Sequence, residues 1–233
     1  MKTLIILPTY NERENIRTLV SEIFRYHPLT DVLFVDDNSP DGTANEVQKL
    51  QKIIPRVFLI ERPQKLGLGS AYITGFKWGL EKGYDTFFEM DADLSHHPKY
   101  LPSFLKAIQT NDLVLGSRYI GGGNIEGWSL FRQFLSKGGS LYSRTLLRLP
   151  YKDLTGGFKC FSSKVLKGIN LDNIQSDGYC FQIELTYQAH LKGFQIKEIP
   201  IIFFNRSCGK SKISRKIVFE ALWKVPFLRF TKY

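Results

Sequence analysis

The sequence is poor in cysteine and has no long apolar run. Only three of its 233 residues are cysteines, without CxxC or histidine-rich spacing, so neither a disulfide framework nor a structural zinc site is indicated. No stretch approaches the roughly 20 apolar residues that a membrane-spanning helix needs. The apolar run at the N-terminus stops at Pro8 and lacks a small-residue cleavage site, which predicts a first buried strand and no signal peptide. These absences favour a reducing, cytoplasmic setting.

The glycine-rich motifs of dinucleotide-binding and phosphate-binding loops are also missing. Residues 7–12 (LPTYNE), which follow the first apolar run, contain no GxGxxG, so a dehydrogenase loses its main support. Residues 67–70 (GLGS) lack the Gly-Lys-Ser/Thr ending of a phosphate-binding loop. We expect a tight turn there that opens a helix.

Positive charge is abundant and unevenly placed. The formal net charge is +10, and from Lys197 to the last residue nine basic residues stand against two acidic ones. This excess predicts an anionic partner, for which a diphosphate, lipid headgroups and nucleic acid are all compatible on charge alone.

Short apolar runs alternate with amphipathic stretches through the first half of the chain. The runs at residues 3–8, 31–37, 56–62, 86–90 and 112–118 read as strands, and residues 16–26, 71–83 and 98–109 read as helices, with another helix opening near residue 43. Strands too apolar to have one wet face predict a doubly wound α/β fold, with helices on both faces of a mainly parallel sheet. Residues 179–192 read as a further helix and residues 194–204 as a strand, whereas residues 119–158 show no clean periodicity.

The strongest local signal is Asp91-Ala92-Asp93, directly after an apolar strand. Side chains two apart share one face of a strand, and ligands of α/β sheets bind beyond the carboxyl ends of the strands. Two carboxylates placed there suit Mg²⁺ or Mn²⁺, which can bridge a sugar-nucleotide diphosphate. On the tripeptide alone, an acidic turn after a strand is an equally good interpretation.

A second acidic pair, Asp36-Asp37, ends the strand expected over residues 31–37. For Asp37 we expect hydrogen bonds to the base or ribose of a nucleotide, and Thr43 is expected to cap the helix that follows the Pro-Asp-Gly turn. In the first loop, Tyr10 can stack on a base and Glu12 can hydrogen-bond to it.

Eight motifs in order give the chain a resemblance to a known family. LPTYNERENI, VDDNSPDGT, LGLGSAY, MDADLSHHP, GSRYIGGG, DLTGGFKCF, GYCFQIE and NRSCGKSK resemble the motifs of dolichyl-phosphate (polyprenyl-phosphate) mannosyltransferases, within the large inverting glycosyltransferase family of GT-A fold. The likeness runs from Thr3 to about Lys212. It implies a GT-A, Rossmann-like, mixed and mainly parallel sheet, and it strongly favours a metal role for the two aspartates over an acidic turn.

The resemblance also implies roles for single residues. Residues that match positions holding the nucleotide are Pro8, Tyr10, Glu12, Val35 and Asp37. The metal and diphosphate site matches Asp91, Ala92 and Asp93, and Arg118 matches a donor-site arginine. Arg206 and Lys212 match basic residues that close over the diphosphate, where with Asp93 they would support catalysis. Arg132 and Ser136 match contacts to the acceptor phosphate.

The implied reaction transfers mannose from GDP-mannose to a dolichyl or other polyprenyl phosphate, with inversion and with Mg²⁺ or Mn²⁺ as cofactor. A phosphate monoester loses its second proton near pH ~6, so the nucleophile needs no general base. Two alternatives stay open within the same enzyme class: another donor such as UDP-glucose, and an acceptor that is not a lipid. A nucleic-acid-binding protein is disfavoured, because carboxylates in the central cleft would repel a phosphate backbone.

We expect one domain over residues 1–233, with a nucleotide-sugar half (residues 1–118), an acceptor half (119–213) and a basic amphipathic C-terminal segment (214–233). A helix over residues 214–225 could lie on an anionic membrane or pack on the domain, with equal support. We therefore expect a peripheral protein on the cytoplasmic face of a membrane, with or without a membrane-anchoring partner. His96 and His97 are expected in a polar loop, and Glu184 in a structural or acceptor-site role.

Overall fold

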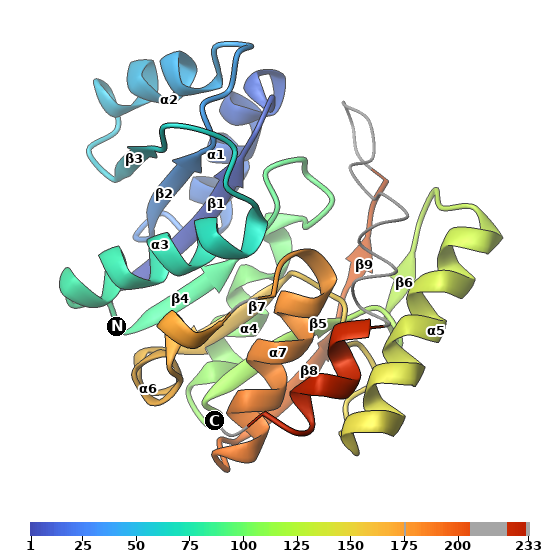
Figure 1. The fold of residues 1–233 in the computed structure, drawn as a ribbon. Coiled ribbons are helices and arrows are strands. Elements are labelled where there is room, and N and C mark those ends of the chain that lie inside the picture. The colour runs from blue at the N-terminus through green and yellow to red at the C-terminus, as the bar shows by residue number, and fades with distance from the viewer. Residues whose placement is uncertain (175, 206–222, 232–233) are drawn as a thin grey trace.

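The computed structural model describes residues 1–174, 176–205 and 223–231, which form one mixed sheet with helices on both faces (Figure 1). The sheet has seven strands in the order β3-β2-β1-β4-β7-β5-β8. The first half contains β1 (Thr3–Thr9), α1 (Arg13–Tyr26), β2 (Asp31–Asp36), α2 (Thr43–Gln51), β3 (Val57–Glu61), α3 (Leu68–Glu81) and β4 (Thr86–Glu89). These elements match the alternation that the sequence predicts.

The second half is less regular. It contains the 3-10 turn η1 (Pro98–Tyr100), α4 (Leu101–Ile108), β5 (Leu113–Ser117), β6 (Asn124–Ile125), α5 (Leu130–Leu147), β7 (Lys159–Ser162), α6 (Ser163–Gly168), η2 (Leu171–Asn173), α7 (Gly178–Leu191), β8 (Ile196–Pro200) and β9 (Ile202–Phe203). Strand β7 runs antiparallel between β4 and β5, whereas the other neighbours in the sheet are parallel. The mixed, mainly parallel, doubly wound sheet is therefore confirmed.

The order of the strands determines where a ligand can bind. The chain adds β2 and β3 on one side of β1 and then returns to place β4 on the other side. At such a switch point the chain leaves the two neighbouring strands in opposite directions along the sheet, which opens a crevice beyond the carboxyl ends of the strands. The segments that leave β1 and β4 begin with Tyr10 and Met90, so both sequence motifs meet at this crevice.

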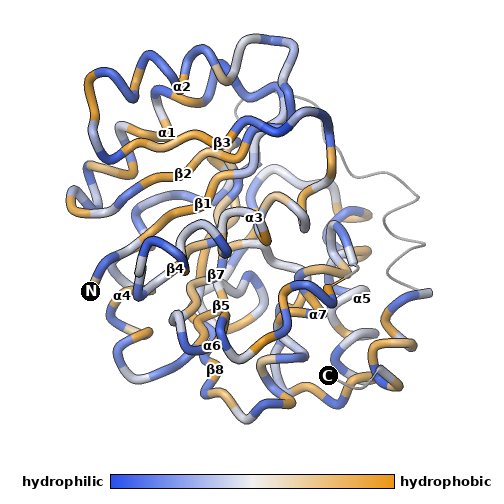
Figure 2. The backbone as a smooth tube through the Cα atoms, turned by 60° about the vertical axis from the view of Figure 1, so that its left-hand side comes forward, coloured by the Kyte–Doolittle hydropathy of each residue, from blue (hydrophilic) through white to orange (hydrophobic). Residues whose placement is uncertain are grey.

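Alternate residues of each strand pack against different helices. On one face, Ile5 and Leu7 of β1 pack with buried residues of α1, α2 and α4. On the other face, Leu4 and Ile6 pack with α3, α6 and α7. All six residues of β2 are buried, and much of β1 and β2 is coloured as hydrophobic in Figure 2. Helices on both faces explain why these strands read as continuous apolar runs.

The structure corrects the sequence prediction in the second half. Helix α5 occupies most of the segment without periodicity, and the sequence did not predict it. Only Ser140, Ser143 and Leu147 of this helix are buried, so it has no apolar stripe directed at the core, and two adjacent glycines lower its intrinsic helix propensity. The strand expected over residues 194–204 is broken at Ile201 into β8, which joins the large sheet, and β9, which pairs with β6.

The C-terminal segment lies largely outside the described residues. Residues 223–228 are helical, and Val225 and Leu228 are buried against Leu147 and Leu149. This described part packs on the domain, whereas Trp223 on the same turn is exposed. Within the described parts of the chain, no helix combines the length and the apolarity needed to cross a bilayer.

Two helical glycines provide a matched test of how closely α3 packs on the sheet. A Cβ at Gly79 would lie 2.4 Å from Phe87 Cε1 and 2.7 Å from Leu4 Cδ2, whereas one at Gly138 of α5 would meet nothing within 4 Å. We expect Gly138→Ala to raise the free energy of unfolding by about 0.5–1 kcal/mol through helix propensity. Gly79→Ala should lower it by roughly 1–2 kcal/mol, because overpacking outweighs the same gain. Urea unfolding measures the free energy of unfolding of both variants. Equal effects of the two substitutions would contradict the close packing at Gly79.

Candidate active site

A cavity of about 340 Å³ lies beyond the carboxyl ends of β1 and β4. Both halves of the chain line it, including the expected site residues Pro8, Glu12, Asp91, Ala92, Asp93, Arg118 and Arg132. A second hollow, of about 390 Å³, lies on the outer side of α2 and is lined by Arg13, Gly42, Asn45, Gln48, Lys49 and Lys52. Although the second hollow is larger, it brings no acidic pair to its surface, so the first cavity is the candidate site.

The loop after β4 folds back on the two aspartates that line the cavity. Asp93 is almost fully buried, and its Oδ1 accepts hydrogen bonds from the backbone N–H of Ser95 (3.1 Å) and from the Ser95 hydroxyl (2.5 Å). Leu94 takes a left-handed conformation with φ of 64°, which turns the chain between the two residues. The loop therefore fixes the Asp93 carboxylate at the cavity wall.

His96 is a buried partner of the Asp91 backbone, so the expectation of a polar loop is wrong for this residue. Its Nδ1 accepts a hydrogen bond from the Asp91 N–H at 3.0 Å, and its ring stacks on Phe158 with centroids 5.1 Å apart. Burial lowers the pKa of His96 against the opposing charges of the aspartates, which favours the neutral ring that this bond requires. His97 faces away, with its ring against Tyr26, as expected for adjacent side chains.

The aspartates fit a hard divalent cation whose other ligands come from the substrate. Carboxylate oxygens are the ligands that Mg²⁺ and Mn²⁺ prefer. Across residues 1–174, 176–205 and 223–231, no group of three or more His, Cys, Asp or Glu side chains is arranged to hold a metal. A cation at Asp91 and Asp93 would therefore take further oxygens from a diphosphate or from water.

The loop after β1 brings Pro8 and Glu12 to the cavity wall. The Oε2 of Glu12 accepts a hydrogen bond from Asn15 Nδ2 at 2.9 Å, and its backbone N–H donates to the Thr43 hydroxyl at 3.0 Å. Thr43 therefore links two loops and does not cap α2; the side-chain acceptor there is Asp41, which receives the Thr43 N–H at 2.9 Å. Tyr10 does not line the cavity itself, but its ring lies 4.0 Å from the Nζ of Lys65, which does.

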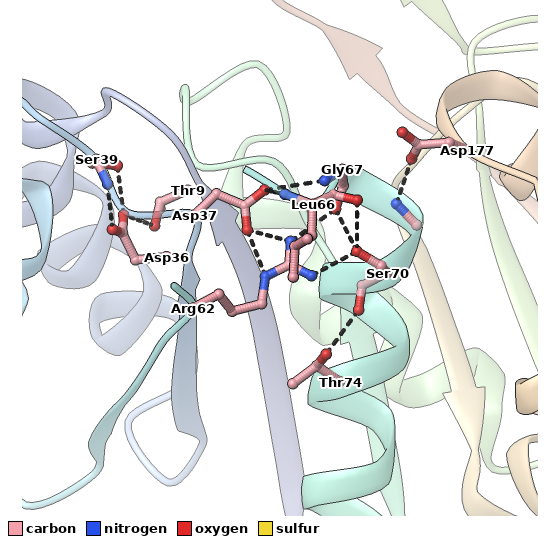
Figure 3. A network of polar contacts seen from close by, with 11 residues as sticks. Thr9, Asp36, Asp37, Ser39, Arg62, Leu66, Gly67, Ser70, Thr74 and Asp177 are labelled. Carbon is pink, nitrogen blue, oxygen red and sulfur yellow. Dashed lines mark hydrogen bonds and ion pairs between the residues drawn. The ribbon is translucent and has the colours of Figure 1, made fainter. Parts of the chain in front are cut away.

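Asp37 holds the loop that leads into α3 (Figure 3). It forms a buried ion pair with Arg62, and its Oδ2 accepts the N–H groups of Leu66 (3.1 Å) and Gly67 (3.2 Å). Arg62 in turn donates to the carbonyl of Gly67 at 2.9 Å and to the Ser70 hydroxyl at 2.6 Å. Neither Asp37 nor Val35, whose side chain is buried under α3, lines the cavity. Their contact with a nucleotide stays a prediction; the structure shows that Asp37 positions a loop that does line it.

The same loop is also held by Asp177, the residue directly before α7. Asp177 Oδ1 accepts the N–H of Gly69 at 2.7 Å (Figure 3). Gly67 has φ of +101°, and a Cβ there would lie 2.5 Å from Asp177 Oδ2. Only glycine fits at this position, because both the backbone conformation and the close carboxylate exclude a side chain.

Arg118 is buried at the cavity wall and held by Asp153. Its Nε and Nη2 donate to the two oxygens of Asp153, both at 2.7 Å, and Nη2 also donates to Thr155 Oγ1 at 2.9 Å. Burial alone would raise the pKa of Asp153, but the charge and hydrogen bonds of Arg118 outweigh it and lower the pKa below its usual value. The ring centroids of Trp128 and Phe203 each lie 5.6 Å from the guanidinium carbon. The cavity wall thus carries a fixed guanidinium, paired with the Asp153 carboxylate, as well as the acidic pair.

Helix α5 brings Arg132 to the cavity but not Ser136. The Arg132 guanidinium carbon lies 3.8 Å from the centre of the Trp128 ring, and both residues line the cavity. The Ser136 hydroxyl accepts a hydrogen bond from Tyr119 at 2.7 Å and is not part of the lining. Of the two expected acceptor-phosphate contacts, the structure therefore places one at the site.

The other residues for which the sequence suggested a role lie outside the described residues or away from the cavity. Arg206 and Lys212 lie outside the described residues. Glu184 is buried in α7 beside Gln188 and does not line the cavity, which agrees with a structural role. Lining residues that the sequence did not identify include Lys65, Trp128, Gly157 and Asp177. The Gly-Gly pair at 156–157 and an aspartate just before a predicted helix were the available signals for two of them.

Comparison with known proteins identifies the relatives of this chain. Residues 4–169 match the family described as Glycosyl transferase family 2. The undecaprenyl-phosphate mannosyltransferase of Micrococcus luteus is 45% identical over 225 residues, which cover 97% of this chain and 93% of that protein. The polyprenol monophosphomannose synthase of Mycolicibacterium smegmatis is also 45% identical, over 226 residues that cover 96% and 85%.

Solved structures share the fold at low sequence identity. Glucosyl-3-phosphoglycerate synthase from Mycobacterium tuberculosis superposes with a TM-score of 0.72 at 16% identity, covering 100% of this chain and 81% of that one. A mannosyltransferase from Pyrobaculum calidifontis, in complex with GDP-Man and Mn²⁺, gives a TM-score of 0.59 at 16% identity and covers 98% and 72%. These similarities confirm the GT-A fold.

Proposed function

Because the chain belongs to glycosyltransferase family 2, we propose that it transfers mannose from GDP-mannose to the phosphate of a polyprenyl phosphate, with inversion at the anomeric carbon. One observation carries the proposal: a single cavity joins the Asp91 and Asp93 pair to Arg118 and Arg132. Such a site can hold a donor diphosphate with its cation at one end and an acceptor phosphate at the other. The activities named for the two relatives at 45% identity support mannose and a polyprenyl phosphate as substrates.

The acceptor end adjoins an apolar surface. Leu130, Phe131 and Phe134, in the first turns of α5, are 84%, 71% and 74% exposed, and Arg132 in the same turns lines the cavity. At the other end of α5, where residues 223–228 pack, Phe227 and Phe230 are also exposed. Exposed aromatic and aliphatic side chains beside a basic residue suit the interface of a membrane. We therefore propose a peripheral position on the cytoplasmic face, from which a lipid-anchored phosphate reaches Arg132.

The proposed reaction is a substitution in which an acceptor phosphate oxygen attacks the anomeric carbon as the nucleoside diphosphate leaves from the opposite side. The acceptor phosphate is largely ionised at neutral pH, since its second pKa lies near ~6. The chain therefore has only to orient the two phosphates and to neutralise the diphosphate that departs. A divalent cation held by Asp91 and Asp93 would supply part of that positive charge. The fixed guanidinium of Arg118, which lines the same cavity, would contribute as well.

The experiment is a transfer assay with radiolabelled GDP-mannose or UDP-glucose and an added polyprenyl phosphate, in the presence of Mg²⁺ or Mn²⁺. We expect label to enter an organic-extractable product from GDP-mannose and not from UDP-glucose, and EDTA to abolish it. Lipid labelling from UDP-glucose alone would show that UDP-glucose, and not GDP-mannose, is the donor. If neither donor gives a lipid product, the proposal of a polyprenyl phosphate acceptor is wrong, and only the membership of the glycosyltransferase family stands.

A further inference from the structure

The side chain of Gln182 in α7 faces the cavity in an unusual state. It is only 2% exposed and lines the cavity. The amide lies beside the buried Glu89 carboxylate, but its carbonyl oxygen Oε1 has no hydrogen-bond partner among the residues that the structure describes. A buried polar group without a partner costs roughly 1–3 kcal/mol, and such groups usually meet a protein atom, a water or a ligand. The amide is therefore a candidate ligand contact that the roles assigned so far leave unused.

Neighbouring groups hold Gln182 in place. Lys159 of β7 donates from Nζ to the Gln182 carbonyl at 2.6 Å and to the Thr186 hydroxyl at 2.9 Å. Lys159 also lies directly opposite Glu89 in the register of β4 and β7. Burial raises the pKa of Glu89 to about 8, against the opposing charge of Lys159 and hydrogen bonding from the Gln182 amide. This buried cluster fixes the first turns of α7 and so presents Gln182 to the cavity.

Gly157 keeps the space between Gln182 and Asp91 open. A Cβ on Gly157 would lie 3.6 Å from Gln182 Nε2, 3.7 Å from His96 Cε1 and 3.9 Å from Asp91 Oδ1. All four residues line the cavity. Without a side chain at Gly157, a small group can approach the amide and the Asp91 carboxylate together.

The chemistry of the amide selects the group that it can bind. It offers two N–H donors and one carbonyl acceptor and carries no charge. A diphosphate offers only acceptors and is matched by the basic residues and by a cation, whereas a hydroxyl both donates and accepts. We propose that Gln182 binds a hydroxyl group of the sugar that is transferred, at the Asp91 side of the cavity. This inference rests on the proposed function as a sugar transferase but does not depend on which sugar nucleotide is the donor.

Isothermal titration calorimetry with matched ligands and matched variants tests this inference. GDP and GDP-mannose, each with Mn²⁺, differ only in the sugar. Gln182→Met removes the amide at nearly constant volume. The control is Gln188→Met on the same helix: Gln188 is equally buried and does not line the cavity. We expect Gln182→Met to bind GDP-mannose about ten-fold more weakly, as the loss of one or two hydrogen bonds implies, with GDP affinity within about two-fold.

Two kinds of outcome overturn the inference. Unchanged affinity for GDP-mannose would mean that Glu89 or a water, not a sugar, satisfies the amide. An equal loss for GDP and GDP-mannose, or the same loss in Gln188→Met, would indicate a structural role. If the wild-type chain binds UDP-glucose and not GDP-mannose, the proposed donor is wrong, but the inference about Gln182 is not affected. The comparison of UDP with UDP-glucose then tests Gln182 in the same way, with thermal melting as the check that each variant is folded.

Discussion

Asp93→Asn is expected to lower the rate of sugar transfer by a factor on the order of 10³. The cation would lose a charged ligand, and the leaving diphosphate would lose the positive charge of the cation. The asparagine keeps an oxygen that can accept the two hydrogen bonds from Ser95. The loop after β4 should therefore keep its conformation, and the thermal melting temperature should stay close to that of the wild type. Steady-state transfer from GDP-mannose measures the effect.

The control for this variant is Asp172→Asn. Asp172 is exposed, is paired with Lys77 on the surface and lies outside the cavity, so its loss should leave transfer unchanged. Near-normal activity of Asp93→Asn, with activity still abolished by EDTA, would place the cation elsewhere. A large fall in the melting temperature of Asp93→Asn would show instead that the charge of Asp93 is needed for folding.

Asp153→Ala should be the most destabilising single change at the site. It leaves the buried guanidinium of Arg118 without its counter-charge, and it removes acceptors for the N–H groups of Arg118 and Gly156. Removing one partner of a buried ion pair lowers the free energy of unfolding by about 3–5 kcal/mol. Urea unfolding at neutral pH measures this loss. Asp172→Ala, which breaks an exposed pair, should cost no more than about 1 kcal/mol.

The pH dependence of stability gives the Asp153 prediction a second readout. The folded-state pKa of Asp153 lies below its ordinary value of 3.8, so its contribution to stability is fully present above that value. The contribution is lost as the pH falls through the lower, folded-state pKa. The difference in stability between wild type and Asp153→Ala should therefore be constant above about pH 5 and shrink in acid. A difference that grows toward low pH would contradict the pairing.

The sequence predicted most of the nucleotide half because its signals are local. Each strand of that half is an apolar run, and helices α1 and α4 carry clear apolar faces. The strand-end aspartates Asp91 and Asp93 lie at the cavity for the same reason: two residues after a strand cannot be far from its carboxyl edge. Pro8 and Glu12 follow from the same argument at β1.

Local pattern failed where burial depends on a partner that the sequence does not indicate. Helix α5 exposes Leu130, Phe131 and Phe134, so its apolar residues do not mark the core side. For Ser136, the motif placed it at the acceptor, but the helix directs its hydroxyl to Tyr119. His96 looked like part of a polar loop, because its aromatic neighbours Phe158 and Phe203 come from segments far along the chain.

By itself, the sequence determined the alternation of strands and helices, the family motifs and the acidic pair at the end of β4. These depend on periodicity and on neighbours within a few residues. Tertiary structure decided what those motifs face: Arg118 meets Asp153 from 35 residues away, and Asp177 reaches Gly69 across 108 residues. Whether an acidic residue binds a ligand or holds a loop, as Asp37 holds the one before α3, depends on which chain segments lie opposite it. Only the packing of the whole sheet places those segments.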